Sequence, residues 1–332
     1  MYHTCRESKC DEFLRGMPRV DYLNMKIILT SAEINSLFAN SDSGTVWSKA
    51  AALLARINPG YDTFLIKTIF DDVMSLFRGE YPGYSAIKTL YHDKPHTLDV
   101  FLCAIRLMHG VHLSGNQLNE EEMTLVMIAA LMHDAGYSLV DGEEGGTGAQ
   151  FTQTHVKRGV EFMKHYLVER HLPSSFAAAL ESMIRSTDPS LDFSRVDFPD
   201  ERTRLLGQIV ATAHLTGQMA DRTYLEKLLF LYLEFKEANY GNYQNMYDLL
   251  CQTKMFYSFT RKKLDGVFGG IYTMLNLHFK DVMGVENNYY LESIEKNIDY
   301  LSKVIARDEQ EYLSMLKRGG IAERSQALVA HL

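Results

Sequence analysis

The sequence has little of what interrupts helices, stabilises secreted domains or crosses membranes. Only 7 of its 332 residues are proline, so long helices meet few obstacles. Its 4 cysteines are too few to build a disulfide framework in a chain of this length. The longest uninterrupted apolar run, Leu125–Met132, is far shorter than the about 20 residues of a bilayer span. Residues 1–13 contain no hydrophobic signal core. We therefore expect a cytoplasmic protein without a membrane-spanning segment.

The sequence also has fewer basic than acidic residues. Lys and Arg together number 34 against 42 Asp and Glu, a formal net charge of −8. Such a surface is a poor binder of long phosphate backbones, so duplex DNA and long RNA are excluded as general partners. A single nucleotide held in a pocket remains compatible with this charge. With 46% hydrophobic and 23% charged residues, the composition is that of a folded globular protein.

The four cysteines fall into two groups with different sequence surroundings. Cys5 and Cys10 lie near His3, and the three form either a frayed tail with spare thiols, which we favour, or a small metal site. Cys103 and Cys251 lie within helical patterns, where we interpret them as small apolar residues.

Apolar residues recur with helical spacing along most of the chain, and sustained strand alternation is absent. Residues 29–58 predict a helix that begins near Thr30-Ser31 and stops at Asn58-Pro59-Gly60. A second helix is expected over Tyr61–Arg78, and helical character returns over residues 222–250. The sequence therefore predicts an all-α fold.

A strong amphipathic stripe lies near the C-terminus. Its members alternate at spacings of three and four residues: Leu291, Ile294, Ile298, Leu301 and Ile305. This pattern indicates a helix that packs on the chain's own core or forms a homodimer seam between C-terminal helices, and the first is the commoner arrangement.

Histidines are the unusual feature, 12 in all, and two of them end similar apolar stripes. The first stripe has the spacing i, i+3, i+4, i+7 and leads into the pair His133-Asp134: Leu125, Ile128, Ala129 and Met132. The second leads to His214 at the same step: Leu206, Ile209, Val210 and Ala213. Polar groups at the buried end of an apolar helix are costly unless something pairs with them.

A third histidine, His96, lies on a helix that is apolar on two faces and is therefore expected to be buried. A lone inward histidine is usually a hydrogen-bonded core residue. Several of them beside a His-Asp pair point instead to a shared metal site, because imidazole and carboxylate are common ligands of divalent metals.

The motifs that carry these residues resemble those of the HD-domain metal-dependent phosphohydrolases. The segment Tyr91-His92, His96, Asp99-Val100 is similar to that of the cyclic-nucleotide phosphodiesterases and their bacterial relatives. Residues 130–137, ALMHDAGY, are similar to the end of the family's His-Asp helix. The resemblance covers roughly residues 85–235. It implies an HD-type helical core at 85–235, with an N-terminal helical extension at 1–84 and C-terminal helices at 236–332 packing on the core.

The resemblance also implies roles for single residues. His96, His133 and Asp134 would hold the tighter metal, and Asp134 would bridge to a second one. His92 would be the general acid that protonates the leaving oxygen, and Asp99 would fix an imidazole by a hydrogen bond. One or two divalent ions are expected, among Mn, Fe, Zn, Mg and Ni.

The chain departs from the family at the fourth ligand. The family has an aspartate after small residues, whereas here the matching residue is His214. Asp221, on nearly the same helical face, is the alternative ligand, but it lies about 10 Å further along the helix. The sequence does not identify the family's base-binding glutamine; Gln218 and Gln252 are candidates for it.

Further candidates follow the His-Asp pair. His155 is either a ligand near the second metal or an exposed residue at a helix start. Lys157 and Arg158 are either a phosphate-binding patch or solvated surface, and the latter is favoured. The glycine-rich segment 141–150 lacks the ending of a phosphate-binding P-loop, and we expect a flexible cover near the pocket or a simple connection.

Together these features favour a hydrolase that cleaves a small nucleotide-type phosphoester, a cyclic nucleotide or a nucleoside monophosphate. A hydroxide generated at the metal would attack phosphorus, with His92 as the acid. Two alternatives stay open. One is a di-iron oxygenase of the HD fold, which His214 favours slightly. The other is a non-catalytic nucleotide sensor.

Overall fold

The computed structural model describes residues 30–38 and 40–330. Within these ranges the fold is all-α, as predicted, and its only extended pairing is an isolated bridge between Tyr84 and Val140. No helix in the described ranges is long and apolar enough to cross a membrane. The possible metal site at His3, Cys5 and Cys10 lies outside the described residues.

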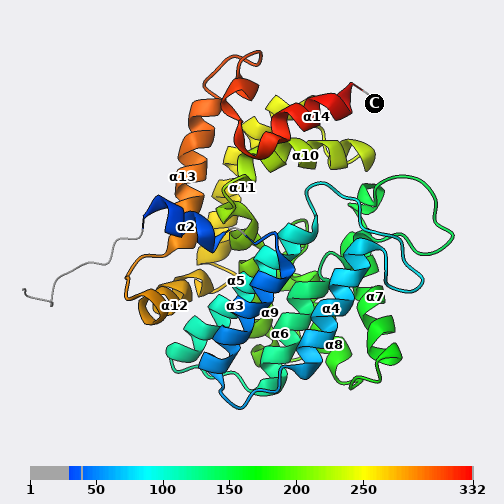
Figure 1. Cartoon of the computed structure of the whole chain (residues 1–332), viewed down its shortest axis with the longest axis vertical. Coiled ribbons are helices and arrows are strands. Elements are labelled where there is room, and N and C mark those ends of the chain that lie inside the picture. Colours follow the sequence, from blue (N-terminus) through cyan, green and yellow to red (C-terminus); the bar gives the residue numbers. More distant parts are fainter. Residues whose placement is uncertain (1–29, 39, 331–332) are drawn as a thin grey trace, which may run out of the picture.

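Three buried helices form the centre of the molecule (Figure 1): α5 (Lys94–Leu113), α6 (Glu120–Met132) and α9 (Glu201–Ala220), which all contact one another. Every residue of α5 from His96 to Val111 is buried, as its two apolar faces predict. The same holds for Met123–Met132 of α6. The helices that hold His96 and His214, and the one that His133 caps, are therefore largely buried.

The remaining helices cover this centre. On one side lie α3 (Ser43–Ile57), α4 (Phe64–Arg78), α7 (His155–Glu169) and α8 (Phe176–Arg185). On the other lie α10 (Tyr224–Glu237), α11 (Met246–Asp265), α13 (Tyr289–Val304) and α14 (Ile321–Val329), while α12 (Met274–Met283) packs against α5. Short 3-10 turns join several of them; those used below are η3 (Ala135–Tyr137) and η4 (Ala149–Phe151).

The N-terminal helical pattern is divided into two helices. We predicted one helix over 29–58, but α2 (Ser31–Leu37) ends before α3 begins at Ser43. The reason is local, because the Asp42 carboxylate accepts a hydrogen bond from Thr45 N at 2.7 Å and so starts a new helix. The next helix begins at Phe64, three residues later than predicted, and ends at Arg78 with Gly79 in the left-handed conformation, φ 73°.

The C-terminal stripe packs within the chain. In α13 the side chains of Ile294, Ile298 and Leu301 are buried, and the helix contacts α9, α10 and α11. Packing on the chain's own core, the commoner of the two arrangements, is therefore what the structure has. This stripe leaves no apolar seam free for a homodimer.

Candidate metal centre

Three histidines converge where α5, α6 and α9 meet. His96 lies in the first turn of α5, where the Asp93 side chain caps the helix by accepting a hydrogen bond from His96 N at 2.9 Å. His133 is the C-terminal cap of α6, and His214 lies in α9. All three are buried, and one ring nitrogen of each lies within 4.8 Å of those of the other two.

The orientation of His133 is fixed by the end of its own helix. Its Nδ1 lies 2.9 Å from the carbonyl oxygen of Ala130. A carbonyl can only accept, so Nδ1 carries the hydrogen and Nε2 presents a lone pair. That Nε2 lies 3.3 Å from Nε2 of His96. The lone pair of His133 Nε2 can therefore accept a hydrogen bond from His96 Nε2–H or, with His96 Nε2 deprotonated, bind a cation together with it.

The Asp134 carboxylate lies beside these two rings. Its Oδ2 is 3.1 Å from Nε2 of His133 and 3.3 Å from Nε2 of His96, but neither oxygen has a well-oriented hydrogen-bond partner, although both are buried. Burial by itself raises the pKa of Asp134, but the neighbouring His133 and His96 lower it more, so that it lies well below its usual value. An ionised carboxylate without donors is costly in the interior unless a cation binds there.

His155 approaches Asp134 from the opposite side. It is the first residue of α7, and its Nδ1 lies 2.6 Å from the carbonyl oxygen of Thr152, so its Nε2 also presents a lone pair. This Nε2 is 3.8 Å from Oδ1 of Asp134. The His155 side chain is only 14% exposed, so the alternative of an exposed helix-start residue is wrong.

A glycine permits this approach. A Cβ on Gly136 in η3 would lie 1.9 Å from the carbonyl oxygen of His155, so only glycine lets η3 pack directly on α7. As a result Asp134 lies between His96 and His133 on one side and His155 on the other.

The donor set fits a divalent transition metal. Burial lowers the pKa of His96 to about 4, and burial together with His133 and His96 lowers that of His214 well below its usual value. Both imidazoles are therefore neutral at pH 7, as coordination requires. Nδ1 of His214 is buried without a hydrogen-bond partner. Histidines with one carboxylate suit Zn, Fe or Ni better than Mg, which prefers oxygen.

His92 is held by a carboxylate from α10. Its Nδ1 lies 2.6 Å from Oε2 of Glu234, whose Oε1 accepts a hydrogen bond from Tyr91 N at 2.6 Å. Burial lowers the pKa of His92, but the attraction of Glu234 outweighs it, and the net pKa is raised above 6.5. Because Nδ1 is bound to Glu234, Nε2 is the nitrogen left to exchange a proton with a ligand.

The Tyr137 ring packs against both His92 and His155, whose own ring centroids are 5.9 Å apart. It stacks on His92 at 4.7 Å between ring centroids and on His155 at 4.5 Å. This stack holds two imidazoles from different segments at a fixed separation.

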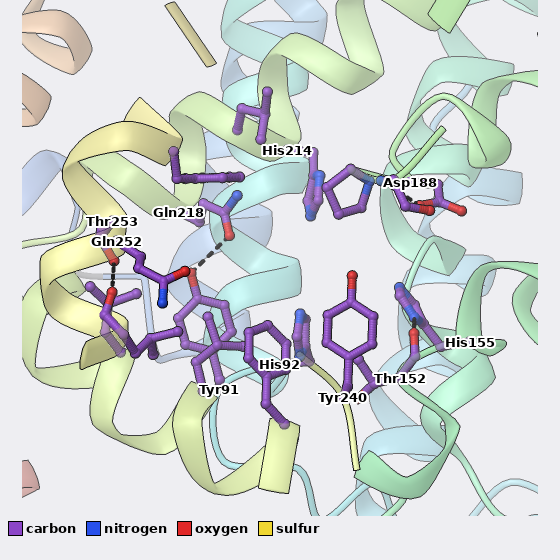
Figure 2. A pocket seen from close by; sticks show the side chains of 18 of the residues that line it. Tyr91, His92, Thr152, His155, Asp188, His214, Gln218, Tyr240, Gln252 and Thr253 are labelled. Carbon is purple, nitrogen blue, oxygen red and sulfur yellow. Dashed lines mark hydrogen bonds between the residues drawn. The ribbon is translucent and has the colours of Figure 1, made fainter. Parts of the chain in front are cut away.

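A cavity of about 530 Å³ opens beside these groups (Figure 2). His92, His155 and His214 line it, while His96, His133 and Asp134 lie behind them. Both glutamine candidates also line it: Gln218, whose Oε1 accepts a hydrogen bond from the Tyr91 hydroxyl at 2.9 Å, and Gln252. The rest of the wall is mainly apolar and aromatic: Leu228, Leu231, Phe235, Tyr240, Tyr243, Leu249, Phe256 and Phe259.

Two sequence-predicted residues lie elsewhere. Asp99 accepts a hydrogen bond from Asn40 Nδ2 at 2.8 Å, and no histidine of the described ranges is hydrogen-bonded to it, so its expected role of fixing an imidazole is wrong. Burial and nearby Asp221 raise the pKa of Asp99. Asp221 itself pairs with Lys227 at 2.7 Å and accepts a hydrogen bond from Thr223 N at 2.8 Å. His214, and not Asp221, therefore joins the histidine group.

The basic pair near His155 does not face the cavity. Arg158 binds the carboxylate of Glu143 and the carbonyl oxygens of Gly136 and Ser138, all at 2.8–2.9 Å. Lys157 is exposed. Arg158 thus anchors the glycine-rich segment, and since residues 141–150 do not line the cavity, this segment is a connection and not its cover.

Sequence reasoning missed Glu234 and Tyr137. Glu234 is a fully buried carboxylate in an otherwise apolar stretch of α10, and that mismatch was the available signal. Tyr137 lies three residues after Asp134 and is also fully buried, but an aromatic residue in a core gives no such signal.

A family model described as Npun_R2479-like matches residues 138–264, well under half of the chain. The matched stretch contains His155, His214 and Glu234, but it begins after His92, His96 and the His133-Asp134 pair. No curated protein matches the sequence.

Proposed function

We propose that the protein is a metal-dependent phosphohydrolase of the HD type that cleaves a small phosphoester. The observation that carries this proposal is the convergence of Nε2 of His96 and Nε2 of His133 on the buried Asp134 carboxylate, whose oxygens have no hydrogen-bond partner. The motif resemblance described above supports the same assignment. His214 completes the histidine group, and His155 faces the other carboxylate oxygen.

In this proposal His96, His133, His214 and Asp134 hold one cation, and Asp134 with His155 offers a position for a second. When bound, a divalent cation supplies Lewis-acid chemistry: it neutralises phosphoryl charge and acidifies water. The chain's own residues position the ester and move the proton. Hydrolysis joins the oxygen of water to phosphorus and breaks the bond from phosphorus to the leaving oxygen.

His92 is the residue suited to protonate that leaving oxygen. Glu234 fixes its Nδ1, and its raised pKa keeps a larger fraction of the imidazolium near neutral pH. The Tyr137 ring prevents the imidazole from tilting, because it stacks on one face of it. The motif resemblance implies a nucleotide substrate. The polar end of the cavity, at His92, His155 and His214, would bind its single phosphoryl group.

The test compares His92→Ala with wild type on an alkyl phosphodiester and on an aryl phosphodiester. We expect the alkyl ester to be cleaved roughly 10²- to 10⁴-fold more slowly by the variant, the range for loss of a positioned acid. The aryl ester should suffer less, because its leaving group needs little protonation. Metal content should not change. If the variant loses metal together with activity, His92 is a metal ligand and not the acid. If metal-loaded wild type hydrolyses neither ester, the proposed hydrolase function is wrong and the non-catalytic nucleotide sensor is favoured.

The second candidate function is oxidation by a di-iron site. The observation that favours it is the nitrogen-rich donor set, in which His214 stands where a carboxylate is expected, beside a largely apolar cavity. Hydrolysis of a phosphoester by iron-free protein under nitrogen would exclude it as the main activity.

A further inference from the structure

A second cavity, of about 310 Å³, adjoins the first. Both cavities are lined by His214 and Leu215 of α9 and by Phe256 and Phe259 of α11. We call the two adjoining cavities the groove: His92, His155 and Gln218 line only the first cavity, and the second has a mainly apolar lining of its own, Leu191, Phe193, Ala211 and Phe268.

Helix α11 follows this groove. Its lining residues run from Leu249 in the first cavity to Lys263 in the second, which at 1.5 Å per residue is about 21 Å of helix. The groove is thus elongated, and a compact nucleoside fills only part of it.

The walls carry little charge. Among the described residues, no Lys or Arg lines the first cavity, and Asp188 is the only carboxylate there. The second cavity adds Lys263, whose Nζ donates a hydrogen bond to the carbonyl oxygen of Pro189 at 3.0 Å. Groups with several phosphates are normally bound by Arg and Lys, so the ligand carries one anionic group at the metal end and none along the groove.

Apolar side chains of α11 are exposed at the same place. Met255 is 58% exposed, Phe256 38% and Phe259 57%, and all three line the first cavity. Large apolar side chains gathered at the wall of a site mark a surface that an apolar ligand covers.

We propose that the substrate of this site is a phosphoester whose substituent is an extended apolar chain, lying along α11 from Leu249 to the Phe256 and Phe259 rings. This inference rests on the proposed function for its head group, and it replaces the nucleoside with an alkyl-like chain. The polar end holds one phosphoryl group, and the groove excludes water from the chain.

Binding tests the inference without catalysis. Alkylphosphonates from methyl to octyl are titrated calorimetrically into the metal-loaded protein. We expect affinity to rise about threefold per methylene, and at least about a hundredfold from methyl to octyl. Affinity that does not depend on chain length would overturn the inference, whatever the variants do.

The variant Phe256→Ser with Phe259→Ser should lose at least nine-tenths of that gain but bind methylphosphonate as wild type does. Phe64→Ser is the matched control, because Phe64 is a 77% exposed phenylalanine on α4 that lines neither cavity, and it should keep the whole gain.

Hydrolysis separates the inference from the proposed function. With alkyl p-nitrophenyl phosphodiesters, KM should fall along the same series, and the octyl ester should be preferred to a cyclic mononucleotide. Hydrolysis with no effect of chain length, or with the nucleotide preferred, would overturn the inference and keep the proposed function. Chain-dependent binding without hydrolysis of any ester would support a site for an apolar chain along α11, but it would overturn the proposed function.

Discussion

At the residue scale, the site depends on buried side chains that hold one another in place. His133 is set by a carbonyl of its own helix, His155 by Thr152, and His92 by Glu234. In each case one ring nitrogen is used for orientation and the other is left for chemistry. Mutations of the orienting group should therefore act differently from mutations of the histidine itself.

Glu234→Gln tests the orientation of His92. Because the Glu234 carboxylate raises the pKa of His92, its removal should lower that pKa. His92 must be protonated to act as an acid, so activity falls as pH rises through its pKa. The alkaline limb of the pH–rate profile should therefore move to lower pH, with activity at pH 8 reduced roughly 10- to 100-fold.

The control for this experiment is Glu237→Gln on the same helix. The Glu237 carboxylate accepts hydrogen bonds from Thr147 and none from His92. Its replacement should leave the profile unmoved. A profile shifted equally by both variants would mean that Glu234 acts through the net charge of α10 and not through its contact with His92.

The fourth ligand can be tested by metal content. His214→Ala should lose most of the bound metal, because His214 is one of the three converging histidines. Asp221→Asn should retain it, because the Asp221 carboxylate is bound to Lys227 and Thr223. The reverse result would show that α9 is positioned differently in the metal-loaded protein.

At the element scale, the site requires η3 to lie directly against α7. Gly136→Ala would place a methyl group 1.9 Å from a carbonyl oxygen, so the backbones must separate. We expect a loss of about 1–3 kcal/mol in the free energy of unfolding, together with weaker metal binding, because His155 moves away from Asp134. Thermal unfolding with and without metal measures both.

Gly44→Ala is the matched control. Its Cβ would meet only the Asp42 carboxylate, at an ordinary 3.5 Å, in the first turn of α3. Alanine should be neutral or slightly stabilising there, by up to about 1 kcal/mol. If Gly136→Ala is as stable as Gly44→Ala, then η3 and α7 can separate without a loss in the free energy of unfolding.

The elements that could be predicted are those whose pattern is local. The apolar stripes that end at His133 and His214 predicted buried histidines, because helical periodicity alone decides which side faces inward. The break between α2 and α3 was not predicted, because it depends on one capping carboxylate, Asp42, within a continuous apolar pattern.

Contacts between segments that are distant in the chain could not be predicted from the sequence. His92 and Glu234 are 142 residues apart, and nothing local pairs them. Arg158 was expected to be solvated surface or, less favoured, part of a phosphate-binding patch, but its guanidinium is bound by Glu143 and the carbonyl oxygens of Gly136 and Ser138. The position of a charged residue in the sequence does not determine which hydrogen-bond and ion-pair partners it has in the fold.

At the scale of the whole molecule, metal binding should stabilise the fold. The ligands come from α5, α6 and α9, so a cation that binds them binds only the folded chain. At a hundredfold excess over Kd the gain is about 2.7 kcal/mol, which raises the melting temperature by several degrees. The increase should vanish in His133→Ala and persist in His112→Ala, since His112 lies at the far end of α5.

The most direct test of the account is the metal content of the purified full chain. Elemental analysis of wild type, before and after incubation with Mn²⁺, Fe²⁺, Zn²⁺, Ni²⁺ or Mg²⁺, should find one or two equivalents of a divalent metal, and Asp134→Asn and His133→Ala should each lose it. Folded wild-type protein that takes up none of these metals would contradict the central claim, because the convergence of His96, His133, His214 and Asp134 would then have another cause.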